Sequence, residues 1–287
     1  MTHIERLKEL LSKAVEKACE PELGVVFSGG IDSTIIALLA SEFSRVTAYS
    51  CGIKGSPDLE YVDKCRNLNF EVRVIELDPK KIEQPLVKII QAINDTNPVK
   101  VSVEVPFYFA SRKAREDGLS VMLCGQGGDE LFGGYNRYLS PLPDYKEAEE
   151  MMKRDVENIY IEQINKDIAV CKENAIELRA PYMDEEFKNY AMEIPMELKI
   201  HEVKNSPEFS CVDIVDGKRF IRKYILRKLG RELGIQDFIL NRKKKAVQYG
   251  SRTWKVLERL ARQKGYKKKA RKAGRRDYVR FFLESLQ

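Results

Sequence analysis

The segment at residues 28–33 constrains the fold of this chain more than any other. An apolar run at 23–27 stops at Ser28-Gly29-Gly30-Ile31-Asp32-Ser33, and a helical stretch follows. A strand that turns at two glycines into a helix leaves free backbone N–H groups at the positive helix end, where phosphate oxygens bind. The serines add hydroxyl donors, and Asp32 can hold the magnesium that accompanies a nucleotide. The segment predicts a triphosphate or pyrophosphate cradle, because the alternative, a turn without a ligand, needs none of these polar side chains.

Strands and helices alternate through the first 140 residues. The predicted strands are 23–27, 46–51, 72–77 and 119–124. The predicted helices are 3–19, 58–68, 80–94 and 105–116. This alternation predicts an α/β fold, a parallel twisted sheet with helices on both faces. Ligands of such sheets bind at the carboxyl ends of the strands, where the glycine turn lies.

The sequence becomes helical and charged after Pro141. Further helices are predicted at 148–169, 185–193, 219–233 and 253–263. We therefore expect an α/β core over 1–140, a helical region on the substrate side over 141–255, and a basic helical tail over 256–287.

Composition excludes several classes of protein. No run of about eighteen apolar residues is present, and the first residues lack a charged leader with an apolar core, so we expect a cytoplasmic protein without a membrane segment. Six cysteines without a C-x-x-C pair, and only two histidines, argue against zinc, iron–sulfur and disulfide frameworks. Any metal should be magnesium held by carboxylates.

A second glycine-rich turn follows the predicted strand 119–124. It contains five glycines between Gly125 and Gly134, with Gln126, Asp129 and Glu130 among them. Packing alone does not explain so many glycines beside carboxylates. We expect Asp129 to share a magnesium ion with Asp32.

Three motifs together resemble a known family. S-G-G-x-D-S at 28–33 is similar to the PP-loop of N-type ATP pyrophosphatases, and G-x-G-x-D-E-L-F-G-G-Y at 125–135 with E-L-R-A-P-Y-M-D at 177–184 resembles the synthetase domain of asparagine synthases. The resemblance implies an adenine nucleotide alpha hydrolase-like fold and an ATP-dependent ligase. ATP would adenylate the aspartate side chain and release pyrophosphate, after which ammonia would give asparagine and AMP.

The resemblance also implies roles for single residues. It places Val26, Cys51, Cys124 and Gly125 around the adenosine, and it aligns Lys244 with a lysine that neutralises the leaving pyrophosphate. The expected ATP and pyrophosphate ligands are Val26, Ser28, Gly29, Gly30, Asp32, Ser33, Cys51, Cys124, Gly125 and Lys244. The alternative for the basic residues around Lys244 is a solvated charged run.

Two features depart from the family pattern. Residue 2 is Thr2 rather than a nucleophilic cysteine, and one predicted helix precedes the phosphate turn, so we expect ammonia to come free or from a separate glutaminase subunit, or another amine to be used. Gln126 replaces the usual glutamate, and an amide cannot act as a general base. Gln126 would orient the ammonia while Glu177 or another carboxylate takes the proton, or it marks a different acceptor.

The basic tail supports competing interpretations. Residues 252–280 contain 13 Lys or Arg and two acidic residues, a local charge of +11 within a chain of net charge +6. The run is either a solvated helix face or a surface for tRNA or another polyanion. The tail supports one alternative to the ligase, a PP-loop pyrophosphatase that adenylates a tRNA base. Gln126 and the missing glutaminase support another, a nucleotide-binding or regulatory subunit without turnover.

Overall fold

A five-stranded parallel sheet forms the centre of the protein. The computed structural model describes residues 1–65, 68–243 and 247–287, with no side-chain description of 247–248. The sheet has the order β3-β2-β1-β4-β5. Its strands are β1 (Glu22–Val26), β2 (Arg45–Ile53), β3 (Glu71–Leu77), β4 (Val121–Leu123) and β5 (Glu177–Arg179). The four predicted strands are confirmed, and β5, which was not predicted, joins the sheet from beyond the expected boundary at 140/141.

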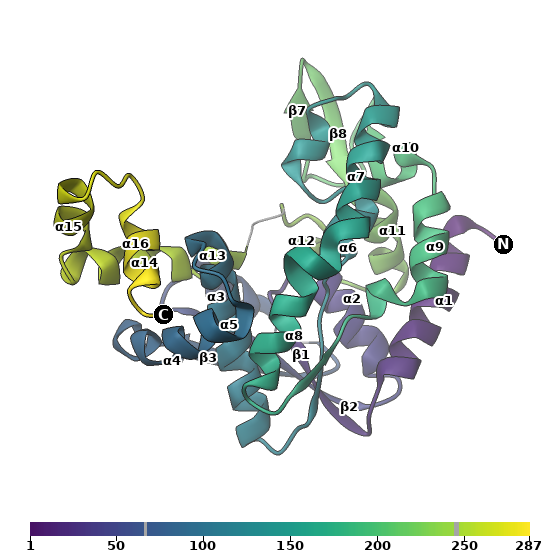
Figure 1. Ribbon diagram of the computed structural model, residues 1–287. Helices are drawn as coiled ribbons and strands as arrows, with labels where there is room; N and C mark the ends of the chain where they lie inside the picture. The colour runs from purple at the N-terminus through teal and green to yellow at the C-terminus, as the bar shows by residue number, and fades with distance from the viewer. Residues whose placement is uncertain (66–67, 244–246) are drawn as a thin grey trace.

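Two hydrophobic clusters cover the two faces of the sheet. Side chains alternate along a strand, so Leu23 and Val25 of β1 enter one cluster while Val26 packs against the other. The first face carries α1 (His3–Ala18), α2 (Ile31–Ala40), α9 (Glu185–Glu193) and α11 (Tyr224–Glu232). The second carries α4 (Pro79–Ile93), α5 (Pro98–Glu116), α8 (Asn165–Lys172), α14 (Thr253–Gln263) and α16 (Tyr278–Glu284). Figure 1 shows α1 and α9 on one side of the strands and α4 and α5 on the other.

Local sequence explains the first helix. Thr2 accepts a hydrogen bond from the Glu5 backbone and Glu5 accepts one from the Thr2 backbone, which forms a capping box. Leu7, Leu11 and Val15 form the buried stripe of α1. The predicted helix 3–19 is confirmed to within one residue.

The helix predicted at 219–233 needs correction. The segment predicted as helix 219–233 begins with a strand, β8 (Lys218–Arg222), and only then enters α11. Asp216 and Gly217 both have positive φ and turn the chain into a hairpin, a geometry that this dipeptide favours. The strand forms a small antiparallel sheet in the order β6-β8-β7, with β6 (Ile200–Glu202) and β7 (Asp213–Val215).

The helix predicted at 148–169 is longer and contains a wide turn. It runs as α7 (Tyr145–Ile159), a π-helical turn (Tyr160–Ile164) and α8. The helix predicted at 58–68 is shorter, with α3 (Pro57–Val62) followed by a 3₁₀ turn, and 66–67 lie outside the described residues. The remaining short elements are α6 (Gly128–Phe132), α10 (Met196–Lys199), α12 (Asp237–Leu240), α13 (Val247–Gly250) and 3₁₀ turns at Asn136–Leu139 and Pro181–Met183.

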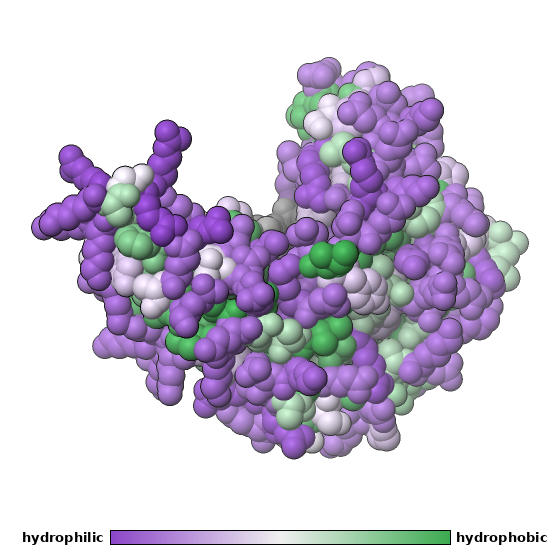
Figure 2. Space-filling view, in the orientation of Figure 1, coloured by the Kyte–Doolittle hydropathy of each residue, from purple (hydrophilic) through white to green (hydrophobic). Residues whose placement is uncertain are grey.

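The basic end of the chain is folded. α14, α15 (Tyr266–Lys272) and α16 pack together, with the Tyr266 ring 5.6 Å from Phe281 and 5.3 Å from Phe282. These C-terminal helices lie beside α4 and α5, and Figure 2 shows a broad hollow between them and the lobe of α7 and the small sheet. No helix among the described residues is both long enough and apolar enough to cross a membrane.

Candidate active site

Both glycine turns leave the sheet at neighbouring strand ends. β1 pairs with β4 through Val25 and Leu123, so the turns after the two strands lie side by side. A Cβ on Gly125 would lie 3.0 Å from the backbone nitrogen of Ser33, and one on Gly128 would lie 2.8 Å from Asp32 Oδ1. Larger residues at these two positions would therefore push the turns apart.

The first turn presents an open helix end. Gly30 is the N-cap of α2 and offers no capping side chain. Ser28 Oγ accepts from the Gly30 backbone at 3.3 Å, and Ser33 Oγ donates to the Gly30 carbonyl at 3.2 Å. These hydroxyls fix the turn itself, while the first N–H groups of α2 remain without a capping side chain. The arrangement suits an anion.

One pocket gathers most of the predicted residues. Those that line it are Val26, Ser28, Asp32, Ser33, Cys51, Cys124, Gly125, Gln126 and Asp129. Gly29 and Gly30 lie in the turn between lining residues. The wall also contains residues that the sequence did not indicate: Phe27, Tyr49, Ser50, Asp58, Pro106, Phe107 and Ala110. Burial raises the pKa of the Cys51 and Cys124 thiols, so both are uncharged parts of the wall.

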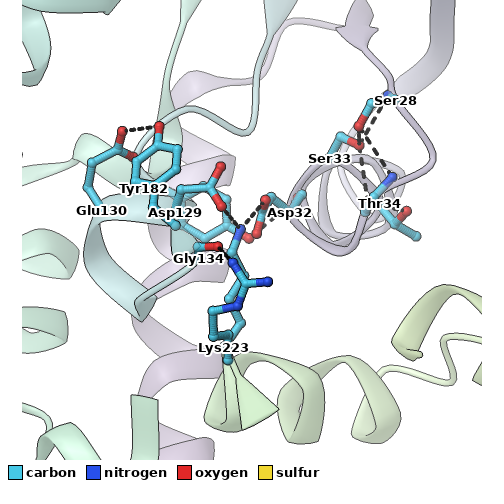
Figure 3. A network of polar contacts seen from close by, with 12 residues as sticks. Ser28, Asp32, Ser33, Thr34, Asp129, Glu130, Gly134, Tyr182 and Lys223 are labelled. Atoms are coloured by element: carbon cyan, nitrogen blue, oxygen red, sulfur yellow. Dashed lines mark hydrogen bonds and ion pairs between the residues drawn. The ribbon is translucent and has the colours of Figure 1, made fainter. Parts of the chain in front are cut away.

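Lys223 is a site residue that sequence reasoning missed. Its Nζ lies 2.5 Å from Asp32 Oδ2 and 2.7 Å from Asp129 Oδ1, and the residue is only 2% exposed. Figure 3 shows the ammonium between the two carboxylates. Lys223 has φ 56° at the junction of β8 and α11, a conformation that costs a residue with a side chain about 1 kcal/mol or more. A continuous helix was predicted over 219–233, so the junction of β8 and α11 was not expected.

Asp32 and Asp129 could hold a hard cation. Both reach the same lysine nitrogen, so their carboxylates converge on one point. Asp32 Oδ1 is buried and accepts no hydrogen bond within the described part of the chain. The described residues contain no group of three or more His, Cys, Asp or Glu that could hold a metal, so phosphate oxygens would have to complete the coordination.

Arg242 connects a distant segment to the phosphate turn. Its guanidinium donates to the Ser28 carbonyl, lies 2.5 Å from Asp58 Oδ1, and stacks over the Tyr61 ring at 4.2 Å. Arg242 therefore contacts two residues of the pocket wall, Ser28 and Asp58.

The Gln126 side chain is hydrogen-bonded to a buried acid, Asp167. Its Nε2 donates to Asp167 Oδ2 at 2.7 Å, and Asp167 is 0% exposed. Glu104 from α5 lies against Asp167 and is 2% exposed. Burial, reinforced by the neighbouring acid, raises the pKa of Glu104 well above its usual range, and burial raises the pKa of Asp167 to about 7. Neither carboxyl was predicted as part of the site.

Comparison with known proteins assigns the family. The family described as asparagine synthase matches residues 6–147 and 140–287. The chain belongs to the asparagine synthase family. It is 34% identical to a Methanocaldococcus jannaschii protein named as a putative glutamine-hydrolysing asparagine synthetase, over 92% of this chain and 53% of that protein. It is 26% identical to the glutamine-hydrolysing asparagine synthetase of Zea mays, over 77% of this chain and 38% of that enzyme.

The chain thus spans about half the length of the first relative and less of the second. Among solved structures, NMN synthetase from Francisella tularensis is similar with a TM-score of 0.45 and 14% identity, over 99% of this chain and 86% of that one.

The structure places one residue suggested by the asparagine synthase resemblance outside the pocket. Glu177 is the first residue of β5 and pairs with Val121, the first residue of β4, whereas the pocket lies beyond the last residues of these strands. Its side chain is 62% exposed and bound to Arg179, which lowers its pKa. The structure therefore does not bring Glu177 to the pocket, where it was predicted to take a proton. Lys244 lies outside the described residues.

Proposed function

We propose that this member of the asparagine synthase family is an ATP-dependent ligase that adenylates a carboxylate and then forms an amide. The acceptor is the aspartate side chain, and the products are pyrophosphate, AMP and asparagine. The observation that carries the proposal is the meeting of two glycine turns, with Asp32, Asp129 and Lys223 at their junction.

The first turn would bind the phosphates. The open end of α2 with Ser28 and Ser33 supplies donors for phosphate oxygens. Lys223 supplies a buried positive charge, which is worth more to a developing anion than an exposed one because water does not screen it. We propose that Lys244 adds a further cation for the leaving pyrophosphate.

Asp32 and Asp129 would hold Mg²⁺. Such an ion would neutralise phosphate charge when ATP is bound. The adenosine would lie against Val26, Cys51, Cys124 and Gly125, in the uncharged part of the pocket wall. The pocket would thus have a polar end for the phosphates and an apolar end for the nucleoside.

The amine would enter beside Gln126. Since an amide takes no proton, this residue orients the nucleophile rather than deprotonating it. The amine is free ammonia in a cytoplasmic reaction, with ammonia from a separate glutaminase subunit, or another small amine, as the alternatives.

Product analysis tests the reaction. Purified protein with ATP, magnesium, aspartate and ammonium should form AMP, pyrophosphate and asparagine in equal amounts. A parallel reaction without aspartate should form no pyrophosphate above background. Formation of ADP would contradict the proposal, as would release of pyrophosphate that no carboxylate stimulates.

A second candidate depends on the C-terminal helices. Lys267, Lys268 and Lys269 are exposed on α15, where they could contact the phosphates of a nucleic acid. The candidate function is adenylation of a tRNA base by the same pocket. It requires tRNA binding at low salt that weakens steeply as salt rises, and failure to bind tRNA at low salt would remove it.

A further inference from the structure

The carboxyl pair behind Gln126 is unusual because neither acid reaches solvent. Glu104 Oε2 and Asp167 Oδ1 are buried and accept no hydrogen bond from any donor that the described residues provide. The two acids nevertheless lie within hydrogen-bonding contact of each other. Two carboxylates cannot donate to one another, so the contact is satisfied when Glu104 keeps a proton and donates it to Asp167.

Asp167 is held from several sides. It accepts from Gln126 Nε2 at 2.7 Å, and Glu104 and Gln163 of the π-helical turn lie against it. Lys166 and Glu130 are charged groups that act on the pair. Packed among these neighbours, the Asp167 carboxylate is the acceptor of the Gln126 amide N–H.

This acceptor determines how the Gln126 amide is turned. Because Asp167 takes the N–H of Nε2, the amide oxygen must point away from the carboxylate. Gln126 lines the pocket, and its Oε1 accepts no hydrogen bond from the residues that the structure describes. The pocket wall therefore offers a neutral acceptor oxygen in a fixed position.

We propose that Asp167 is a positioning residue that turns the Gln126 carbonyl oxygen into the pocket, where it accepts a hydrogen bond from an N–H of the attacking ammonia or primary amine. The amide takes no proton. It binds the nitrogen through N–H and leaves the lone pair free to attack. This inference rests on the proposed function and adds the binding site of its nucleophile.

Two assays on the full chain separate the steps. Aspartate-dependent exchange of labelled pyrophosphate into ATP reports adenylation without an amine, and asparagine formation over a range of ammonium concentrations gives the KM for the amine. Asp167→Leu removes the acceptor. We expect it to raise the ammonium KM about tenfold, the value of one hydrogen bond, while the exchange rate changes less than about twofold.

Three further variants distinguish positioning from a general structural role. Asp167→Asn keeps an acceptor oxygen and should restore most of the amine affinity. Gln126→Leu should raise the ammonium KM as Asp167→Leu does, and the double variant should be no worse than either one, because both remove the same contact. Glu162→Gln is the matched control, an exposed acid near Asp167 that pairs with Lys100, and it should leave both assays unchanged.

Several results would overturn the inference. These are an unchanged ammonium KM in Asp167→Leu, an equal fall in exchange and amide formation, or additive effects in the double variant. If Asp167→Leu does not fold, Gln126→Leu decides, since a normal ammonium KM in that variant overturns the inference. Absence of exchange by the wild-type protein with any carboxylate would instead reject the proposed function, and this inference with it.

Discussion

Two pairs of acids lie beside the same pocket and are stabilised in different ways. Asp32 and Asp129 share the ammonium of Lys223, whereas Glu104 and Asp167 lie against each other, and burial raises the pKa of both carboxyls. The first pair can exchange its lysine contacts for contacts with a metal ion and phosphates. The second pair has a raised pKa and a hydrogen bond to Gln126, so it is suited to hold a neighbouring group in place. Burial alone therefore does not show which acids can bind a metal ion. The group that each acid contacts, an ammonium or a second carboxyl, makes the difference.

The largest effect should come from removal of the shared cation. Lys223→Met removes the ammonium that both carboxylates contact, which should lower the free energy of unfolding by about 3–5 kcal/mol in the absence of magnesium. AMP formation should fall by at least about 100-fold. Urea unfolding and product assays measure the two effects.

The matched control is Lys228→Met, which changes a half-buried lysine of α11, the helix that Lys223 caps; the Lys228 ammonium lies 5.6 Å from the Tyr224 ring. Magnesium and ATP should recover part of the stability of Lys223→Met if a metal ion binds between the carboxylates. Wild-type stability of Lys223→Met would show that the first pair does not need its ammonium.

Asp129→Asn should lower AMP formation strongly and the free energy of unfolding only modestly. The ammonium keeps Asp32 as a partner, so the loss of stability should be smaller than in Lys223→Met. AMP formation should fall about 100-fold, because a carboxylate expected to hold magnesium is lost. Asp155→Asn is the control, since Asp155 pairs with Arg137 away from the pocket. Normal AMP formation by Asp129→Asn at low magnesium would contradict the comparison.

Gly125→Ala tests how closely the turns must approach. The new methyl group would lie 3.0 Å from Asp32 Cβ and from the Ser33 nitrogen, so we expect about 1–3 kcal/mol of destabilisation and a KM for ATP raised about tenfold. Gly118→Ala meets no atom within 4 Å but has φ of +89°. It should lose stability without any change in the KM for ATP, and an equal change in both variants would argue against the role of Gly125.

The most gradual effect should be the pH dependence of stability that the Glu104 and Asp167 pair causes. The folded state raises the pKa of Asp167 from 3.8 to about 7, so it binds more protons than the unfolded state between these values. Stability should therefore fall as pH rises through this window, by at most about 1.4 kcal/mol per pH unit. Combined Glu104→Gln and Asp167→Asn should flatten this part of a urea-midpoint profile, whereas Glu162→Gln should not. An unchanged slope in the double variant would mean that other groups cause it.

The sequence predicts the phosphate side of the site better than the amine side. Strand ends and glycine turns are local signals, so the amino-acid order is enough to place Ser28, Asp32 and Asp129 together. Lys223 and Asp167 carry no local signal, because each looks like an ordinary charged residue of a helix until the chain brings it to the pocket. The π-helical turn at Tyr160–Ile164 was likewise hidden within a regular apolar pattern.

Glu177 illustrates a different kind of error. The strand that contains it was not predicted, and linear order does not tell which end of a strand a residue occupies. The folded sheet answers that question, because Glu177 pairs with Val121 at the start of β4. The Asp216-Gly217 pair, in contrast, was a readable hairpin signal that would have revealed β8 and the start of α11.

The position of β5 in the sequence, after residue 140, matters when this protein is shortened. A fragment that stops near residue 140 would contain both glycine turns and yet leave the backbone of β4 without its outer neighbour. Bare strand edges recruit other chains, so such a fragment should aggregate rather than fold into a small nucleotide-binding unit. A shortened form of this molecule should therefore extend at least through Arg179, the last residue of β5.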